Sequence, residues 1–321
     1  MSRGALALLI RGGTQNWSAE RWKARFDKVC GDRRVLQGAE ATADPKDVHY
    51  AAVWKPVPGE LAAFPNLKVI FNLGAGVDAV MADQSLPNVP LVRVAVGDLT
   101  GRMTEYVVQH VLMHHRQELY LRQSQRDKRW RPKYQWSANA ISVGIMGLGT
   151  LGADAAEVLR RIGFRVAGWS RSPKQIDGID CFSGDGQIDA FLQRTDILVC
   201  LLPLTPQTRH ILNREVFAKL NRTSPLGAPV VINAGRGGLQ NEADILACLD
   251  DGTLGAASLD VFETEPQPPE SPFWTHPRVL LTPHNAADID PDEISKYVAR
   301  QIERFEAGGA LENVVERGRG Y

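Results

Sequence analysis

The chain has 321 residues, of which 44% are hydrophobic and 23% charged, and its 37 Lys and Arg residues balance 37 Asp and Glu residues. This composition is ordinary for a soluble globular protein, the length suggests two domains, and the charge balance argues against a nucleic acid or a membrane as the partner. No apolar stretch is long enough to span a bilayer, and the four cysteines are scattered without metal-ligand spacing, which predicts a reduced, cytoplasmic protein without a metal site.

The first part of the chain is expected to alternate strands with helices. Short apolar runs typical of strands lie at residues 5–10, 50–54, 68–71 and 91–94. After the first run, Ser18 is placed to cap an amphipathic helix with Trp22 and Phe26 on one face. Such alternation is typical of a parallel sheet covered on both faces, so this part is expected to be a small α/β domain.

One long helix from Asp98 to Arg122 is expected next, because its apolar residues recur at helical spacing. His110 and His114 share a face of this helix in the spacing of a metal pair, but no third ligand is evident, and a buried or interface role is expected instead. Residues 126–136 are polar, basic and rich in tryptophan, which is typical of an arm that packs on a partner subunit.

A glycine fingerprint follows at residues 141–152. An apolar strand reaches Met146, the chain then reads Gly147-x-Gly149-x-x-Gly152, and a helical pattern continues to Ile162. Gly147 permits a tight turn, Gly149 lets the backbone approach a pyrophosphate, and Gly152 lets the helix pack on the strand. The helix start then offers N–H groups and a positive dipole end to phosphates. The segment predicts dinucleotide binding; its alternative is a plain glycine-rich turn.

The next strand, at residues 165–169, indicates which nucleotide binds. A carboxylate near its end would accept the ribose 2′-hydroxyl of NAD, but the sequence there reads Ser170-Arg171-Ser172-Pro173-Lys174. Arg171 can pair with a 2′-phosphate, which a carboxylate would repel. We therefore predict NADPH as the preferred cofactor, with NADH as the alternative; an ordinary surface role for Arg171 and Lys174 stays open.

The later part continues with strands and helices. Further strands are expected at residues 196–202, 229–233, 256–259 and 279–281, and a last helix after Pro291. Asn241 is placed to cap a helix with Asp244 in a capping-box position, and Gly252 stands where a C-terminal cap belongs.

Three loops after these strands carry reactive side chains: Arg236 among glycines, the carboxylates of residues 260–265, and His284 directly after a strand. Loops at the carboxyl ends of parallel strands are where α/β sheets place ligands. Taken singly, each has a structural alternative: a helix cap for the arginine, solvated carboxylates, and a structural histidine. Together with the fingerprint they favour an active site.

With these residues, the chain resembles the D-2-hydroxyacid dehydrogenases over nearly its whole length. The resemblance runs from residues 72–78 through the fingerprint and residues 202–208 to the Arg236, Glu265 and His284 loops. Within that family the chain is most similar to the glyoxylate/hydroxypyruvate reductase branch, because of residues 169–172, 268–274 and the terminal 319–321.

The resemblance implies two Rossmann-like or flavodoxin-like parallel-sheet domains with a cleft between them. Residues 1–98 and 287–321 would form the substrate-binding domain, and residues 99–286 the NADP-binding domain with the 126–136 dimerisation arm. The family forms homodimers, and Trp130 would enter the partner's active site. The implied reaction is NADPH-dependent reduction of small 2-oxo acids, glyoxylate to glycolate and hydroxypyruvate to D-glycerate.

The resemblance also implies the role of each site residue. His284 would donate the proton, Glu265 would orient its ring, and Arg236 would bind the substrate carboxylate and carbonyl. Further substrate contacts would come from Trp54, Gly74, Ala75 and Gly76. The cofactor-binding residues would be Gly147, Gly149, Thr150, Leu151, Gly152, Ser170, Arg171, Ser172, Leu202, Pro203, Thr208, Ala234, Asp260 and Ala286.

Related proteins with this fold have three other functions. A formate-oxidising relative would be expected to carry Gln where Glu265 stands. A phosphoglycerate dehydrogenase usually has an acidic residue near Ser170, and many have an added C-terminal domain; neither feature is found here. Transcriptional corepressors of the same fold use the nucleotide as a conformational switch without catalysis, and the sequence leaves that binding role open.

Overall fold

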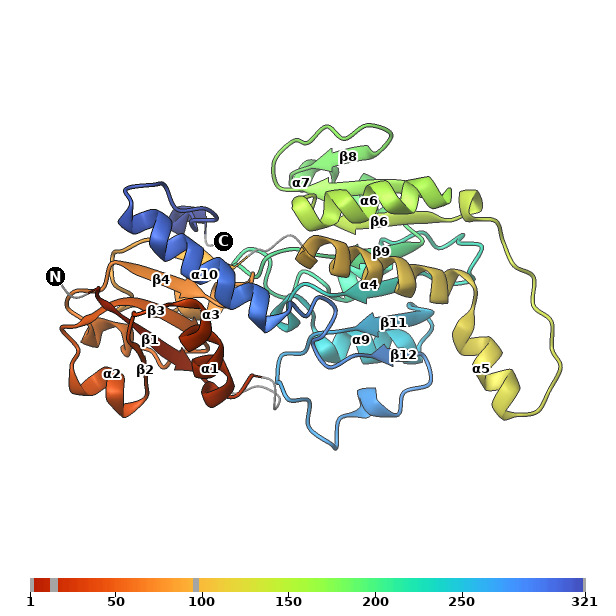
Figure 1. Ribbon diagram of the computed structural model, residues 1–321. Helices are drawn as coiled ribbons and strands as arrows, with labels where there is room; N and C mark the ends of the chain where they lie inside the picture. Colours follow the sequence, from red (N-terminus) through yellow and green to blue (C-terminus); the bar gives the residue numbers. More distant parts are fainter. Residues whose placement is uncertain (1–2, 12–16, 95–97, 320–321) are drawn as a thin grey trace. The chain divides into compact units, whose positions relative to one another are not determined.

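The computed structural model describes residues 3–11, 17–94 and 98–319 (Figure 1). The chain forms two compact units. Unit 1 consists of Met1–Asp98 together with Ile289–Tyr321, and unit 2 is the continuous segment Leu99–Asp288. None of the helices in the described ranges is long and apolar enough to cross a membrane.

Unit 1 is built on a five-stranded sheet with the order β2-β1-β3-β4-β5, in which every pair is parallel. This is the flavodoxin-like strand order. The central strands read as continuous apolar runs because both of their faces are buried. The strands are β1 (Ala5–Ile10), β2 (Val35–Gln37), β3 (Val48–Trp54), β4 (Val69–Asn72) and β5 (Leu91–Arg93).

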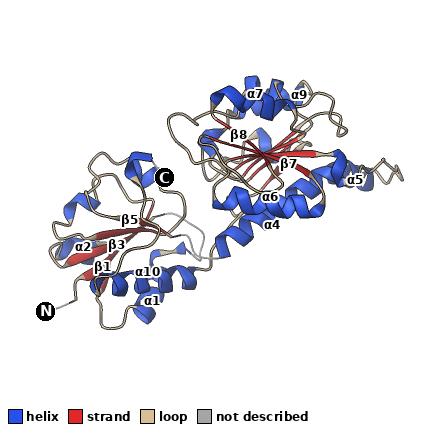
Figure 2. Cartoon of the chain, turned by 90° about the horizontal axis from the view of Figure 1, so that it is seen from above, coloured by secondary structure: helices blue, strands red, loops and turns tan. Residues whose placement is uncertain are grey.

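The helices of unit 1 come from both ends of the chain. They are α1 (Ala19–Val29), α2 (Ala39–Ala43), α3 (Asp78–Met81) and α10 (Pro291–Glu306), with 3-10 turns at Leu61–Ala63 and Arg317–Arg319. The predicted cap is present, since the Ser18 hydroxyl accepts a hydrogen bond from the Arg21 N–H at 3.4 Å. Figures 1 and 2 show α10 beside α1, where Arg25 and Asp292 form an ion pair at 2.9 Å.

Unit 2 is built on a seven-stranded parallel sheet with the order β12-β11-β10-β9-β6-β7-β8. Six of these strands reproduce the order of the Rossmann fold, in which the order reverses between the first and fourth strands, here β6 and β9. The strands are β6 (Ser142–Met146), β7 (Arg165–Ser170), β8 (Asp180–Ser183), β9 (Ile197–Cys200), β10 (Val230–Asn233), β11 (Ala256–Leu259) and β12 (Val279–Leu281). The predicted parallel α/β architecture is thereby confirmed in both units.

Helices cover both faces of this sheet. Figure 2 shows α4 and α6 on one face and α7 and α9 on the other, and each pair encloses its own apolar core. The helices are α4 (Asp98–His115), α5 (Glu118–Arg126), α6 (Thr150–Ile162), α7 (Asp185–Gln193), α8 (Arg214–Ala218) and α9 (Glu242–Asp250), with 3-10 turns at Ala138–Ala140, Gly237–Leu239 and Pro272–Trp274.

The prediction of one long helix from Asp98 to Arg122 is wrong. Helix α4 ends at His115, and Gln117 adopts a left-handed backbone with φ 59° before α5 begins. The Gln117 side chain donates to the Tyr134 carbonyl at 2.8 Å, so this break is held by the following segment. A second helix therefore carries the chain toward residues 127–137, which form neither strand nor α-helix.

The caps predicted for α9 are only partly as expected. The Asn241 side chain accepts from the Asp244 N–H at 3.2 Å, and Gly252 has φ 80°, as a helix-ending glycine should. The Asp244 carboxylate instead accepts from the Arg214 N–H at 3.0 Å, so it joins α9 to α8.

Candidate active site

The three fingerprint glycines each meet a different steric demand at the start of α6. Gly147 has φ 107°, and a Cβ there would lie 2.9 Å from the Leu201 backbone. A Cβ on Gly152 would lie 1.9 Å from the Gly147 carbonyl oxygen, so helix and strand pack more closely than any side chain allows. Gly149 faces open space, with no atom within 4 Å of its Cβ position. The N-terminus of α6, which starts with Thr150 and Leu151, is thus left uncovered by Gly149 and can receive an anion.

The end of β7 carries hydroxyl and basic groups. Ser170 is buried at the strand end and its hydroxyl donates to the Ser172 carbonyl at 2.8 Å, which turns the chain. Arg171 and Lys174 follow on the exposed side of this turn. No carboxylate stands among residues 169–174, so the position that selects NAD in the Rossmann fold is filled by residues suited to a phosphate.

Arg236 lies on the loop after β10, and buried amides hold that loop. The Asn233 side chain accepts from the Gly235 N–H at 3.0 Å and donates to the Arg236 carbonyl at 3.1 Å and to Gln240 at 2.8 Å. Gln240 in turn donates to the Val261 carbonyl at 3.0 Å, which joins this loop to the one after β11. Asn233 and Gln240 are both fully buried, and neither is predicted as a site residue from the sequence.

Asp260 organises the loop that carries His284. Its carboxylate accepts from the Thr282 hydroxyl at 2.7 Å and from the N–H groups of Asn285 at 3.0 Å and Ala286 at 3.1 Å, and its carbonyl accepts from the His284 N–H at 2.8 Å. Burial raises the pKa of Asp260, and these hydrogen bonds oppose that rise. Tyr106 extends the network, because its hydroxyl lies 2.9 Å from the Thr282 hydroxyl.

His284 and Glu265, which lie on different loops, form a hydrogen-bonded pair. The Nδ1 atom of His284 lies 2.8 Å from Oε2 of Glu265, and Oε1 of Glu265 accepts from the Phe262 N–H at 3.1 Å. His284 has φ 53°, a left-handed backbone that is uncommon for a residue with a Cβ. Because a carboxylate accepts the Nδ1 proton, the Nε2 atom is left to exchange a proton with another molecule. The imidazole is 42% exposed, as a group that must reach a ligand requires.

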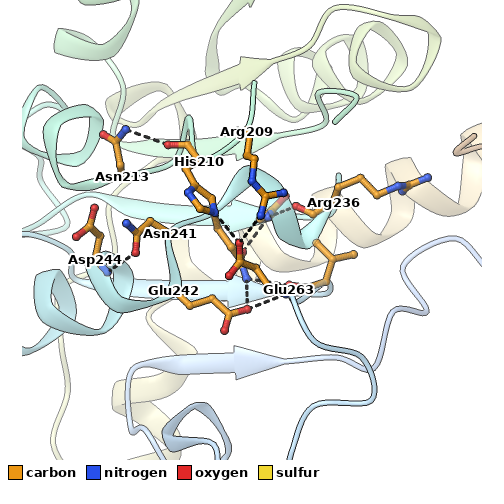
Figure 3. Close-up of polar contacts among 11 residues, drawn as sticks. Arg209, His210, Asn213, Arg236, Asn241, Glu242, Asp244 and Glu263 are labelled. Atoms are coloured by element: carbon orange, nitrogen blue, oxygen red, sulfur yellow. Dashed lines mark hydrogen bonds and ion pairs between the residues drawn. The ribbon is translucent and has the colours of Figure 1, made fainter. Parts of the chain in front are cut away.

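A second histidine–carboxylate pair uses the same loop, because Glu263 lies two residues before Glu265 and pairs with His210, which lies on the loop after β9. Figure 3 shows the side chains of Arg209 and His210 converging on Glu263, whereas Arg236 extends away from them. The distance from His210 Nε2 to Glu263 Oε1 is 2.5 Å, and that from Arg209 to the same oxygen is 3.7 Å. The Glu263 N–H donates to Glu242 at 2.9 Å.

The loop between β9 and α8 contains three of the predicted cofactor contacts. Leu202 is buried, while Pro203 and Thr208 are partly exposed. The Thr208 hydroxyl donates to the Pro203 carbonyl at 2.8 Å and accepts from the Thr205 N–H at 2.8 Å, so it closes the turn. Ala234 and Ala286, also predicted to contact the cofactor, are buried in the core that contains α4 and α6.

In unit 1 the structure brings Trp54 and the Gly74-Ala75-Gly76 loop together. Trp54 ends β3, and a Cβ on Gly74 would lie 2.5 Å from its ring. The Asn72 side chain at the end of β4 donates to the carbonyls of Gly74 at 2.7 Å and Gly76 at 2.9 Å. Asn72 in unit 1 and Asn233 in unit 2 thus have the same role. Each is the last residue of a strand, and its side chain holds the following loop through hydrogen bonds. An Asn as the last residue of a buried strand was the available sequence signal.

His110 and His114 are buried against β11, as expected. His110 Nδ1 lies 2.8 Å and His114 Nε2 lies 2.7 Å from the hydroxyl of Ser258. A hydroxyl has one proton, so at least one of these ring nitrogens donates to it. Burial lowers the pKa of His110 to about 4 and that of His114 to about 3, so both rings are neutral at physiological pH. Within the described ranges no group of three or more His, Cys, Asp or Glu side chains is placed to hold a metal ion.

The segment predicted to be an arm exposes its aromatic side chains. Trp130 is 99% exposed and Tyr134 is 71% exposed. Tyr134 packs edge-on against Trp136 with a ring-centroid distance of 4.8 Å, and Lys133 lies over the Tyr120 ring at 4.9 Å. Gly320 and Tyr321, part of the terminal resemblance, lie outside the described residues.

Comparison with known proteins identifies the family. The family model for the NAD binding domain of D-isomer specific 2-hydroxyacid dehydrogenases matches residues 108–286. A glyoxylate/hydroxypyruvate reductase A from Yersinia enterocolitica is 39% identical over 311 residues, which cover 95% of this chain and 97% of that protein.

Two solved structures share the whole fold. An NADPH-dependent glyoxylate/hydroxypyruvate reductase from Sinorhizobium meliloti, in complex with NADP and sulfate, is 46% identical with a TM-score of 0.92, covering 99% of this chain and 100% of that one. A probable 2-hydroxyacid dehydrogenase from Rhizobium etli, in complex with NADP, HEPES and L(+)-tartaric acid, is 42% identical with a TM-score of 0.93 and the same coverage. The predicted family is thereby confirmed: the chain belongs to the D-isomer specific 2-hydroxyacid dehydrogenases, a family of oxidoreductases.

Proposed function

We propose that this protein reduces small 2-oxo acids with NADPH, converting glyoxylate to glycolate and hydroxypyruvate to D-glycerate. The observation that carries the proposal is the His284–Glu265 pair, because it supplies an oriented proton donor on a loop at the carboxyl end of the parallel sheet. The Yersinia and Sinorhizobium relatives bear the name of this activity, and the Sinorhizobium relative is described as NADPH-dependent.

The residues present fit a bound NADPH. Gly149 leaves the N-terminus of α6 open toward a pyrophosphate, and Gly147 and Gly152 hold strand and helix close together. Arg171 follows Ser170 where a 2′-phosphate would lie, and no carboxylate is present to repel it. When bound, NADPH supplies the hydride that reduces the substrate carbonyl carbon.

The side chains then bind, orient and protonate the substrate. The planar guanidinium of Arg236 is suited to the carboxylate and carbonyl oxygen of a 2-oxo acid, and it stabilises the negative charge that develops on that oxygen. His284 donates the Nε2 proton to the same oxygen, while Glu265 accepts from Nδ1 and orients the ring. In unit 1, the N–H groups of Gly74-Ala75-Gly76 are assigned to the substrate carboxylate and Trp54 to the pocket wall.

The experiment is a substrate and cofactor panel. Glyoxylate, hydroxypyruvate and larger 2-oxo acids are mixed with NADPH or NADH, and the loss of absorbance of the reduced nicotinamide gives kcat/KM. We expect the two small acids with NADPH to give the highest values. A protein that binds NADPH but turns over no 2-oxo acid would instead be a nucleotide-sensing binding protein.

Arg171→Ala tests the cofactor assignment. Loss of a charge-assisted bond should raise KM for NADPH by about tenfold or more, while KM for NADH stays within twofold. Arg161→Ala is the matched control, since Arg161 is an exposed arginine that pairs with Glu157 on α6. Equal changes for both cofactors would argue against contact between Arg171 and a 2′-phosphate.

We also propose a cytoplasmic homodimer, supported by four free cysteines and by the exposed aromatic side chains of residues 130–136. In the dimer, Trp130 would reach the active site of the partner. Sedimentation of the wild-type protein and of the Trp130→Ala variant tests the dimer. The KM of this variant for hydroxypyruvate tests the contact of Trp130 with the partner's active site. A monomeric wild-type protein would contradict both the dimer and this contact.

A further inference from the structure

The His210–Glu263 pair connects two of the loops on which the proposed function depends. His210 lies on the loop that follows β9, and Glu263 lies on the loop that follows β11, two residues before Glu265. The loop of Arg236 follows β10, the strand between these two in the sheet. The pair therefore connects the two loops that flank the Arg236 loop on either side.

Backbone contacts attach the His210 segment firmly to the Arg236 loop. The N–H of His210 donates to the Gly238 carbonyl at 2.9 Å, and the N–H of Leu212 donates to the Leu239 carbonyl at 2.9 Å. A Cβ on Gly238 would lie 2.9 Å from the Leu204 side chain and 3.3 Å from that of Arg209. Residues 204–212 thus follow the Arg236 loop closely.

The Arg236 loop is packed equally closely on its other side. A Cβ on Gly237 would lie 2.0 Å from the backbone carbonyl of Phe262, so the two backbones are in direct contact. The N–H of Phe262 donates to Glu265, and the N–H of Glu263 donates to Glu242 at the start of α9. A shift of residues 262–263 would therefore move both the Arg236 backbone and the carboxylate that holds His284.

The two paired histidines also share an unusual backbone. His210 and His284 both have φ 53°, and each directs its ring to a glutamate of the same short loop. A left-handed residue with a Cβ persists when its surroundings fix it. For His284 these surroundings are Asp260 and Glu265, and for His210 they are Gly238 and Glu263.

We infer that His210 and Glu263 are positioning residues for the reduction. Their ion pair, which we call the clasp, holds the loop of Arg236 and the loop of Glu265 in fixed positions relative to each other. The inference rests on the proposed function. The clasp acts through Arg236 on substrate binding and through Glu265 on the orientation of His284. It does not touch the glycine fingerprint, and the turn of Pro203 and Thr208 is closed by its own hydrogen bonds, so the affinity for NADPH should stay near the wild-type value.

The expected effect is modest, because both side chains are partly exposed, His210 at 42% and Glu263 at 37%. Exposed ion pairs contribute little individually, and loss of this one should lower kcat/KM for glyoxylate by about fivefold. His210→Asn removes the reach to Glu263 and suits the left-handed backbone, which Asn tolerates. Glu263→Ala removes the other partner. Glu215→Gln is the control, because Glu215 makes an exposed ion pair with Lys219 elsewhere in unit 2.

The test compares His210→Asn, Glu263→Ala, their double variant and Glu215→Gln. Steady-state kinetics give kcat and KM, NADPH fluorescence gives Kd, and hydrogen exchange followed by mass spectrometry reports on residues 235–241 and 261–265. We expect each single variant and the double variant to lose the same roughly fivefold in kcat/KM, with faster exchange in both segments, wild-type Kd and wild-type melting temperature.

Wild-type exchange and kinetics in His210→Asn would overturn the clasp, as would a double variant whose loss is the product of the two single losses. A general structural role would instead lower the melting temperature and weaken NADPH binding, which also contradicts the inference. If the wild-type protein turned over no 2-oxo acid, the proposed function would fail, and the exchange rates would still decide whether the clasp exists.

Discussion

Replacing Gly152 by alanine tests the packing of α6 on β6. The added Cβ would lie 1.9 Å from the Gly147 carbonyl oxygen and 3.3 Å from the Ile145 side chain. The first neighbour is backbone and cannot rotate away. Because ordinary contact begins at 3.4 Å, the start of the helix must move by about 1.5 Å.

This displacement has two measurable consequences. Overpacking of this kind destabilises by about 1–3 kcal/mol, and the better helix propensity of alanine offsets about 0.5–1 kcal/mol. Because the clash is with backbone, the cost lies near the upper end of that range, and the net loss of about 2–2.5 kcal/mol should lower the melting temperature by roughly 4–10 °C. Moving the N–H groups of α6 by about 1.5 Å takes them out of hydrogen-bond range of a pyrophosphate, so Kd for NADPH should rise about tenfold or more.

Thermal unfolding and NADPH fluorescence measure these effects, and Gly101→Ala is the matched control. Gly101 lies in α4 with no atom within 4 Å of its Cβ position, so alanine there should raise the melting temperature by roughly 1–4 °C and leave Kd unchanged. If Gly152→Ala kept both the stability and the NADPH affinity of the wild type, the steric reasoning would be refuted.

Three further predictions concern protonation and substrate binding. His284→Ala should lower kcat by about two to four orders of magnitude while Kd for NADPH stays constant; unchanged turnover would remove His284 from the mechanism. Arg236→Lys should raise KM for glyoxylate strongly despite the retained charge, because the planar guanidinium is lost; a wild-type KM would contradict this role. Finally, the pKa values of about 4 for His110 and about 3 for His114 lie below the unfolded value, so the unfolded state binds more protons below about pH 6.5. The free energy of unfolding, measured in urea, should be insensitive to these groups above pH 6.5 and fall by up to about 1.4 kcal/mol per pH unit for each ring toward pH 4. His114→Gln should make that fall shallower, and an unchanged pH profile would show that the ring does not resist protonation.

The sequence predicted the elements that carry strong local patterns. The buried strands of both sheets and the helices with clear caps, such as those opened by Ser18 and Asn241, are present. Two strands and four helices were missed: β2, β8, α2, α3, α7 and α8. They are short, and β8 is a partly exposed edge strand that reads Asp-Cys-Phe-Ser, without an apolar pattern. The break at Gln117 was also missed, since glutamine carries no preference for a left-handed backbone.

In the candidate site, too, the sequence predicted what depends on a local pattern and missed contacts between distant segments. The glycines of the fingerprint were identified because each occupies a position with a known steric demand. The pairing of His284 with Glu265 came from family resemblance, because 19 residues separate them in the chain. The contact of Gln240 with Val261 depends on tertiary folding, because the two residues lie on different loops. The contacts of Asn72 and Asn233 are local, and an Asn at the end of a buried strand was the signal for them.

Unit 1 is built from two segments that are far apart in the sequence, and this has a consequence for the order in which the two units fold. Its sheet is completed from the far end of the sequence: Val92 pairs with Val314, the Arg317 guanidinium bonds to the carbonyls of Pro87 and Val89, and Arg33 pairs with Glu306. During synthesis, the segment Met1–Asp98 therefore cannot reach its final packing until the segment Ile289–Tyr321 has been added. The continuous segment Leu99–Asp288 has no such delay and can fold on the ribosome first. Unit 1 thus begins before unit 2 along the chain but can be completed only after it.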